Sequence, residues 1–250
     1  MKLKTLIASV CMLCLGYTAS AQIYGGSSKN NSGGGITYGV RIGATIANIN
    51  SDPEDGADMG SGEIDIKSTT GIQVGALANF YINEVLSIQP EILYIQKGSK
   101  AMYKEEESFP EFKYYGEGEV ELKTNYIEVP VLAKANFGTG NFNFFFTAGP
   151  TVGYWLSGIE KADFKATYTD GIDTYEESES SSDDVEFDDD TKRFEVGASI
   201  GLGLGYKLGT GALNFDVRYG LGLTDIYTTE GDEQAKNRVI GVSLAYIFGK

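Results

Sequence analysis

The sequence contains no histidine, and its two cysteines, Cys11 and Cys14, both lie near the amino terminus. Without histidine, the chain lacks the usual general base and the commonest transition-metal ligand. Cleavage after residue 21 would also remove both thiols, which would leave no disulfide and no thiolate chemistry. These absences argue against most hydrolases and metalloenzymes, so we expect no enzymatic activity, no cofactor and no metal centre.

Long apolar runs are scarce as well. The longest, Leu6 to Leu15, follows Lys2 and Lys4 and precedes Ala19-Ser20-Ala21. This run is shorter than the roughly 20 residues of a membrane-spanning helix, and its flanks are typical of a secretory signal peptide. A helical membrane protein is therefore excluded. We expect a signal peptide at residues 1–21, a flexible periplasmic Gly/Ser/Asn linker at 22–35 and a folded domain at 36–250.

Basic residues are outnumbered, with 20 Lys and Arg against 35 Asp and Glu. This balance argues against binding to nucleic acid. Most of the acids lie in four long polar segments, at about residues 50–69, 100–120, 157–192 and 228–236. The third segment has many oxygen ligands suited to calcium but lacks the D-x-D-x-D-G spacing. We interpret it, and the acidic first segment, as solvated loops.

Between the polar segments the chain alternates apolar and small or polar residues, as β-strands with two unlike faces do. Counted along the chain, the second, fourth and sixth connections between strands are tight turns rich in Gly and Asn. The other four connections are the long polar segments. This order predicts an all-β, eight-stranded antiparallel up-and-down meander with its long loops at one end. The expected strands are 36–49, 70–81, 86–99, 121–137, 142–156, 193–208, 212–227 and 237–249.

The composition of the two faces decides between two architectures. A soluble barrel or sandwich turns its apolar face inward, whereas a transmembrane barrel turns that face toward lipid. In 193–208 the bulky apolar residues alternate mainly with Gly and Ser, which suit a narrow lumen better than a solvated surface. Aromatic residues near both strand ends, Trp155 among them, predict interfacial girdles. We therefore predict a transmembrane β-barrel.

Charged residues on the small-residue face predict an ion-pair network inside the lumen. Four of each sign lie on this face, and unpaired charges in a narrow lumen would be costly. The alternative is simple pairing on a solvated surface. The expected lumenal residues are Arg41, Glu91, Glu128, Lys134, Glu195, Lys207, Asp216 and Arg218.

The glycine run Gly201-Leu202-Gly203-Leu204-Gly205 superficially resembles a phosphate-binding loop. A dinucleotide loop needs G-x-G-x-x-G spacing and a following helix, but Gly205 breaks the spacing and another strand follows. We instead expect these glycines to make room for the lumenal charges. Prolines at 90, 130 and 150 fall inside predicted strands, and we expect a bulge where Pro130 lies opposite Gly149.

Several phrases resemble the PorT-like outer-membrane β-barrel family of Bacteroidetes. They are "GVRIGATIANI", "LSIQPEILYIQKG", "NYIEVPVLAKANF", "FFFTAGPTVGYWLSG" and the closing "GVSLAYIFGK", and together they span about residues 36–250. The resemblance implies an eight-stranded barrel in the bacterial outer membrane. Its founding members are linked to type IX secretion, so an accessory role in a secretion machinery is one implication.

We expect a non-catalytic outer-membrane barrel that supports the envelope or binds a protein partner through its extracellular loops. The alternatives are a narrow channel and the secretion-accessory barrel. Expected partners are outer-membrane lipid, lipopolysaccharide and the barrel-assembly machinery, and no nucleic acid.

Overall fold

The computed structural model describes residues 35–51, 63–109, 112–138, 140–171, 173–188, 191–226 and 235–249. The predicted signal peptide, nearly all of the linker and most of the first acidic segment lie outside these ranges. Across the described residues, no helix has the length and apolar character that crossing a membrane requires. All the strands lie within one compact unit, Gly33–Lys250.

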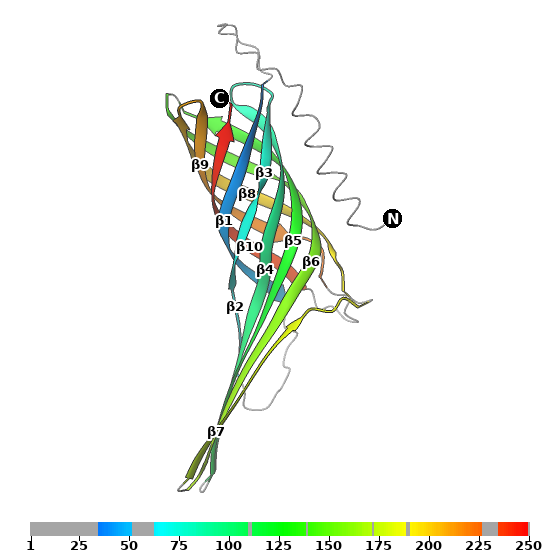
Figure 1. The fold of residues 1–250 in the computed structure, drawn as a ribbon, viewed down its shortest axis with the longest axis vertical. Helices are drawn as coiled ribbons and strands as arrows, with labels where there is room; N and C mark the ends of the chain where they lie inside the picture. Colours follow the sequence, from blue (N-terminus) through cyan, green and yellow to red (C-terminus); the bar gives the residue numbers. More distant parts are fainter. Residues whose placement is uncertain are drawn as a thin grey trace. The chain divides into compact units, whose positions relative to one another are not determined.

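Eight antiparallel strands close into a ring, in which each strand pairs with the next along the chain and β10 pairs with β1 (Figure 1). This arrangement confirms the predicted up-and-down barrel. The ring strands are β1 (Ile36–Ser51), β3 (Thr69–Tyr81), β4 (Leu86–Phe109), β5 (Phe112–Phe137), β6 (Phe142–Asp170), β8 (Phe194–Leu208), β9 (Gly211–Gly222) and β10 (Ala235–Phe248).

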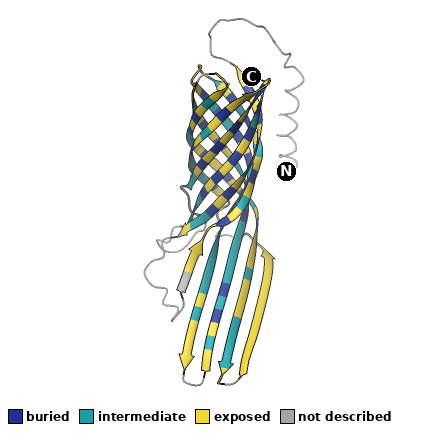
Figure 2. Cartoon of the chain, turned by 90° about the vertical axis from the view of Figure 1, so that its left-hand side faces the viewer, coloured by how far each residue is buried: buried dark blue, intermediate teal, exposed yellow. Residues whose placement is uncertain are grey.

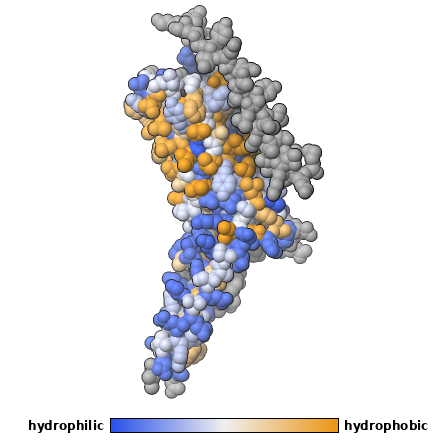
Figure 3. Space-filling view, in the orientation of Figure 1, coloured by the Kyte–Doolittle hydropathy of each residue, from blue (hydrophilic) through white to orange (hydrophobic). Residues whose placement is uncertain are grey.

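Burial alternates along the ring strands (Figure 2). The buried positions are mainly polar, whereas the exposed positions on the wall are rich in large apolar residues. On β1, Arg41 is 3% exposed whereas the adjacent Ile42 is 66% exposed. Figure 3 shows the apolar residues gathered over the barrel wall. A water-soluble barrel would show the opposite polarity, so the wall of this barrel faces lipid.

The short turns follow the local sequence signals. In the β3–β4 turn, the Asn83 side-chain oxygen accepts hydrogen bonds from the amides of Val85 and Leu86, at 2.9 and 2.8 Å. Gly140 and Gly209, in the next two turns, have φ angles of 80° and 62°. These angles strain residues that carry a Cβ atom, which explains the choice of glycine.

Beyond one end of the ring, β4, β5 and β6 continue as a projecting sheet, which we call the extension (Figure 1). It comprises residues 99–109, 112–123 and 159–170, together with β2 (Glu63–Lys67) and β7 (Asp173–Asp184), in the order β2-β4-β5-β6-β7. The prediction that 100–120 and 157–192 are loops is therefore wrong for most of their length. These polar segments still form paired strands, because the backbone hydrogen bonds between strands do not require an apolar face.

The predicted position of the bulge is also wrong. Pro130 lies opposite Thr151, and the register continues unchanged to Ala133. The turn is longer than expected, since Phe137 pairs with Phe144 instead of Phe142. The register shift between β5 and β6 occurs instead at Asn125/Tyr126.

Candidate functional site

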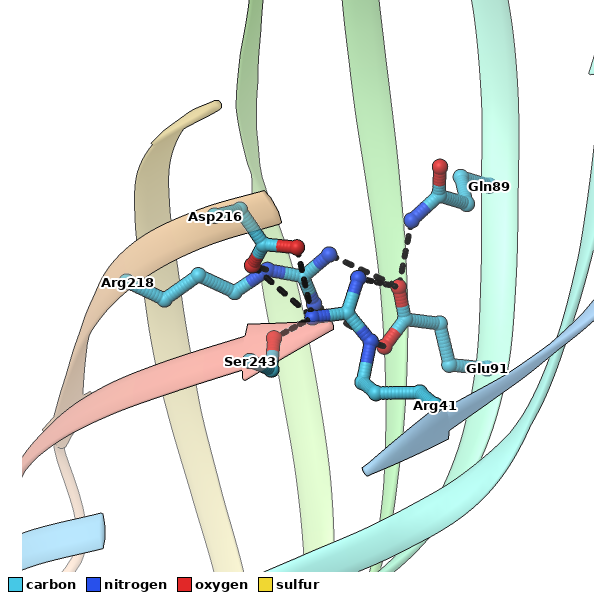
Figure 4. Close-up of polar contacts among 6 residues, drawn as sticks. All are labelled: Arg41, Gln89, Glu91, Asp216, Arg218 and Ser243. Atoms are coloured by element: carbon cyan, nitrogen blue, oxygen red, sulfur yellow. Dashed lines mark hydrogen bonds and ion pairs between the residues drawn. The ribbon is translucent and has the colours of Figure 1, made fainter. Parts of the chain in front are cut away.

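A buried cluster of four charged residues crosses the lumen (Figure 4). Arg41 on β1 and Arg218 on β9 both contact Glu91 on β4 and Asp216 on β9. Arg218 Nη1 and Nη2 lie 2.9 Å from the two oxygens of Glu91, and its Nε lies 2.9 Å from Asp216 Oδ1. The cluster has two charges of each sign, so its net charge is zero.

Neutral side chains complete this first cluster. Gln89 donates a hydrogen bond to Glu91, and Arg41 donates one to Ser243 on β10. Asp216 is completely buried, and Glu91 is 3% exposed. Because the charges are buried, loss of one partner would leave a costly unpaired ion. The geometry suits a structural plug whose carboxylates are fully engaged.

A second cluster lies along the lumen and centres on Lys97 of β4. Its Nζ lies 2.7 Å from Glu128 Oε2 and 2.6 Å from Glu195 Oε1. Asn237 donates a hydrogen bond to Glu195, and the ammonium lies 4.7 Å from the ring centroid of Tyr126. Sequence reasoning missed Lys97, although it lies six residues after Glu91 and therefore on the same strand face.

The other two predicted lysines differ in their burial. Lys134 is buried, with its Nζ 4.1 Å from the Phe145 ring centroid. Lys207 pairs with Ala212 next to the Gly209 turn, and its side chain is exposed. It does not join the lumenal network, because the strand has already reached the end of the barrel there. With Lys97 in place of Lys207, the lumenal set still has four charges of each sign.

Glycines provide the space that the first cluster occupies. A Cβ atom on Gly201 would lie 2.7 Å from Cγ of Arg218 and 2.9 Å from the Thr147 hydroxyl. On the opposite side of Arg218, a Cβ on Gly241 would lie 2.8 Å from the amide nitrogen of Gln73. The glycine ladder of β8 thus makes room for a lumenal charge, as predicted from the sequence.

The cavity between the two clusters is small. A cavity of about 40 Å³ lies between the two clusters, and Lys97, Glu128, Glu195 and Arg218 contribute to its lining. A cavity of this size holds a few water molecules at most. It is too small for a substrate or a cofactor.

At the rim from which the extension projects, Trp155 is fully buried and not exposed to lipid as the girdle prediction required. Its ring stacks on Tyr126 at 5.9 Å and meets the edge of Phe187 at 5.2 Å. Arg193 lies over the Phe187 ring at 4.0 Å and donates a hydrogen bond to the Trp155 carbonyl oxygen. Val185, Phe187 and Arg193 therefore return to the rim and cover this aromatic cluster.

The extension has two chemically different faces, which the continuous strand registers define. One, the lysine face, carries ion pairs such as Lys100–Glu119 at 2.6 Å. The hydrogen bond in that pair raises the pKa of the Lys100 ammonium. The lysines of this face are Lys67, Lys100, Lys104, Lys113, Lys123, Lys161 and Lys165.

The other side of the extension, the aromatic face, continues the lumen-facing side of the strands. Tyr114 and Tyr168 lie together on it with ring centroids 5.3 Å apart. Its aromatic residues are Tyr103, Phe109, Phe112, Tyr114, Phe164, Tyr168 and Tyr175. Despite the many acids, no group of three His, Cys, Asp or Glu side chains in the described part of the chain could hold a metal ion.

The chain matches a family model described as the outer membrane protein beta-barrel domain over residues 21–228. The chain belongs to this family. Members of the outer membrane protein beta-barrel family reside in the bacterial outer membrane, which agrees with the lipid-facing wall. The finer PorT-like assignment remains a prediction.

Solved structures with similar folds are small outer-membrane barrels of low sequence identity. OprG from Pseudomonas aeruginosa is 13% identical with a TM-score of 0.43, and the match covers 88% of this chain and 99% of OprG. Neisserial surface protein A is 14% identical with a TM-score of 0.36, over 86% of this chain and 99% of that protein. Ail of Yersinia pestis is 15% identical with a TM-score of 0.35, over 87% and 100% of the two chains. No curated protein matches the sequence.

Proposed function

We propose that this outer-membrane barrel is a closed, non-catalytic scaffold that presents the extension to a protein partner outside the cell. The observation that carries the proposal is the continuity of β4, β5 and β6 from the barrel wall into the extension. A sheet anchored in this way loses little conformational entropy on binding, which favours recognition. In outer-membrane barrels the longer connections are extracellular, which supports the orientation.

The non-catalytic part of the proposal is supported by the state of the buried carboxylates. Glu91 and Asp216 contact two arginines, and Glu128 and Glu195 contact Lys97. A general acid or base must be able to exchange a proton with a substrate. These four groups are instead held in ion pairs, and the cavity that Glu128 and Glu195 line has room for only a few water molecules.

The scaffold role is tested with a shortened barrel, in which residues 99–120 and 159–184 are each replaced by an Asn-Gly turn. We expect the shortened protein to keep heat-modifiable migration on a denaturing gel, because the ring and both lumenal clusters remain. We also expect it to lose the partners that the detergent-extracted full-length protein captures. Capture of the same partners by both proteins would overturn the proposal.

Conductance in planar bilayers tests whether the barrel is closed. Pure wild-type protein should show no stable unitary currents, because paired charges cross the lumen at two levels. Stable currents would support the narrow-channel alternative. Co-purification of secretion-machinery components with the shortened barrel would instead support the accessory role implied by the PorT-like resemblance.

A further inference from the structure

The charges of the extension are unevenly divided between its two faces. On the lysine face, Lys165 and Lys123 lie 3.8 and 3.5 Å from Glu117 and Glu121, in addition to the Lys100–Glu119 pair. Among the described residues of the aromatic face there is no lysine or arginine. Its carboxylates are Glu105, Glu107, Glu160, Asp170, Asp173, Glu177, Glu179 and Asp183.

The aromatic face also contains a groove of about 540 Å³. Tyr103, Tyr114 and Phe164 line it together with Glu177 and Glu179 of β7. Rings of this kind attract cations through their π-faces, and carboxylates beside them add a direct charge attraction. The groove therefore has the chemistry of a site for cationic side chains.

The side chains that border the groove do not neutralise the charge of its carboxylates. Lys165 also borders it, but strand alternation directs the Lys165 side chain to the lysine face, where it lies 3.8 Å from Glu117. The phenol of Tyr103 donates a hydrogen bond of 2.6 Å to Glu105 and so leaves the Glu105 charge in place. Gly116, on the groove floor, has no side chain that could fill it.

The adjacent edge of the sheet leaves room for an extended chain. β7 pairs with β6, and in the described residues no strand pairs with its other edge. All twelve residues of β7 are exposed. It contains neither proline nor lysine, the residues that commonly protect edge strands, but it is rich in carboxylates. A second copy of this chain would be repelled by like charge.

We propose that the aromatic face of the extension binds an extended, lysine- or arginine-rich polypeptide segment, whose basic side chains enter the groove beside β7. Charge complementarity selects this occupant, because the face offers carboxylates and rings without a single described counter-cation. The inference rests on the proposed scaffold function and names the chemistry of its partner. Anionic lipopolysaccharide groups would meet repulsion on this face.

The test uses full-length protein in zwitterionic detergent and a fluorescein-labelled ten-residue peptide of alternating Lys and Thr. The variant E177Q/E179Q removes two charges from the aromatic face, and the matched control E176Q/D184N removes two charges from the other side of the same strand. We expect the first variant to weaken peptide binding about fivefold or more, the scale of two exposed ion pairs. The control should bind within about twofold of wild type, and high salt should weaken all binding.

A second pair of variants tests the aromatic contribution. Phe164→Ala should weaken peptide binding, whereas Tyr115→Ala, on the lysine face, should not. Each variant is first checked for heat-modifiable migration, which reports that the barrel is folded. A peptide of alternating Glu and Thr should not bind.

Four results would overturn the inference. Equal weakening of peptide binding by E177Q/E179Q and E176Q/D184N would show that binding depends on the overall negative charge of the extension and not on a defined site. Failure of the Lys-Thr peptide to bind wild-type protein would indicate a different occupant. So would binding of maltohexaose, an uncharged sugar, that is lost in the Phe164→Ala variant. If the shortened barrel loses its partners while E177Q/E179Q retains them, the inference fails and the scaffold proposal stands.

Discussion

Arg41 Nη1 lies 2.8 Å from each carboxylate oxygen of Asp216, although 175 residues separate the two along the chain. Arg41 is on β1 and Asp216 is on β9, and β10 lies between these strands. The pair therefore forms only after the ring has closed. It links the first and the penultimate strands of the barrel through the lumen.

We predict that Asp216→Asn destabilises the barrel by about 3–5 kcal/mol, because it leaves Arg41 and Arg218 with a single carboxylate between them. Urea-induced unfolding in lipid vesicles, followed by Trp155 emission, measures the change. The control is Lys207→Gln, whose side chain is exposed at the turn end. Equal stability of Asp216→Asn and wild type would contradict a structural role for the cluster.

Lys97→Met should cost about 3 kcal/mol or more in the same assay, because Glu128 and Glu195 would then share the lumen without a cation. Lys207→Met has the same chemistry and should change stability little. The comparison separates a lumenal lysine from one at the barrel end. Similar losses for the two variants would argue against the second cluster.

Gly201→Val should destabilise the barrel by about 1–3 kcal/mol, the usual range for overpacking. The new Cβ would lie within 2.7 Å of the Arg218 side chain and 2.9 Å of Thr147. Ala198→Val, on the lipid side of the same strand, is the matched control and should be nearly neutral. Thermal unfolding of both variants in one detergent checks the difference.

Phe187→Ala should shift Trp155 emission to longer wavelength, because Phe187 meets the edge of the buried indole at 5.2 Å. Trp155 is the single tryptophan of the chain, so the signal is unambiguous. We expect a modest stability loss of about 1–2 kcal/mol, less than for a fully buried phenylalanine. Phe164→Ala, on the extension, should leave the emission unchanged.

Acidification should loosen the rim near Glu121. A hydrogen bond from Thr69 lowers the pKa of Glu121 below its ordinary value of about 4.3. The folded state thus favours the ionised form, and the stabilisation is present above the ordinary value and lost as pH falls through the lowered one. Hydrogen-exchange protection factors at the start of β3 should fall over that range.

The matched controls for this titration are two glutamine variants. Glu121→Gln should abolish the pH dependence at the start of β3, because the titrating group is gone. Glu106→Gln, on the same face of the extension, should retain it. An unchanged profile in Glu121→Gln would show that another group is responsible.

The sequence predicted most of the lumenal residues because strand alternation assigns a face to every residue. Lys97 could also have been found, because it lies within the predicted strand 86–99 and on the same strand face as Glu91. Trp155 was misplaced although alternation along β6 assigns it to the lumen, because it was grouped with the aromatic residues expected at the lipid interface. It pairs with Tyr126 in the same register as Gly153 with Glu128, and the register shift begins only beyond it.

The sequence by itself determined the eight strands of the ring, the places of the tight turns and the inverted polarity of the wall. These are local properties, because backbone alternation and glycine conformations depend on neighbouring residues. Only the tertiary structure decided which charges meet in the lumen and that β4 to β7 continue as a sheet. Both depend on ring closure and on the stagger between strands, which bring together residues as distant as Arg41 and Asp216.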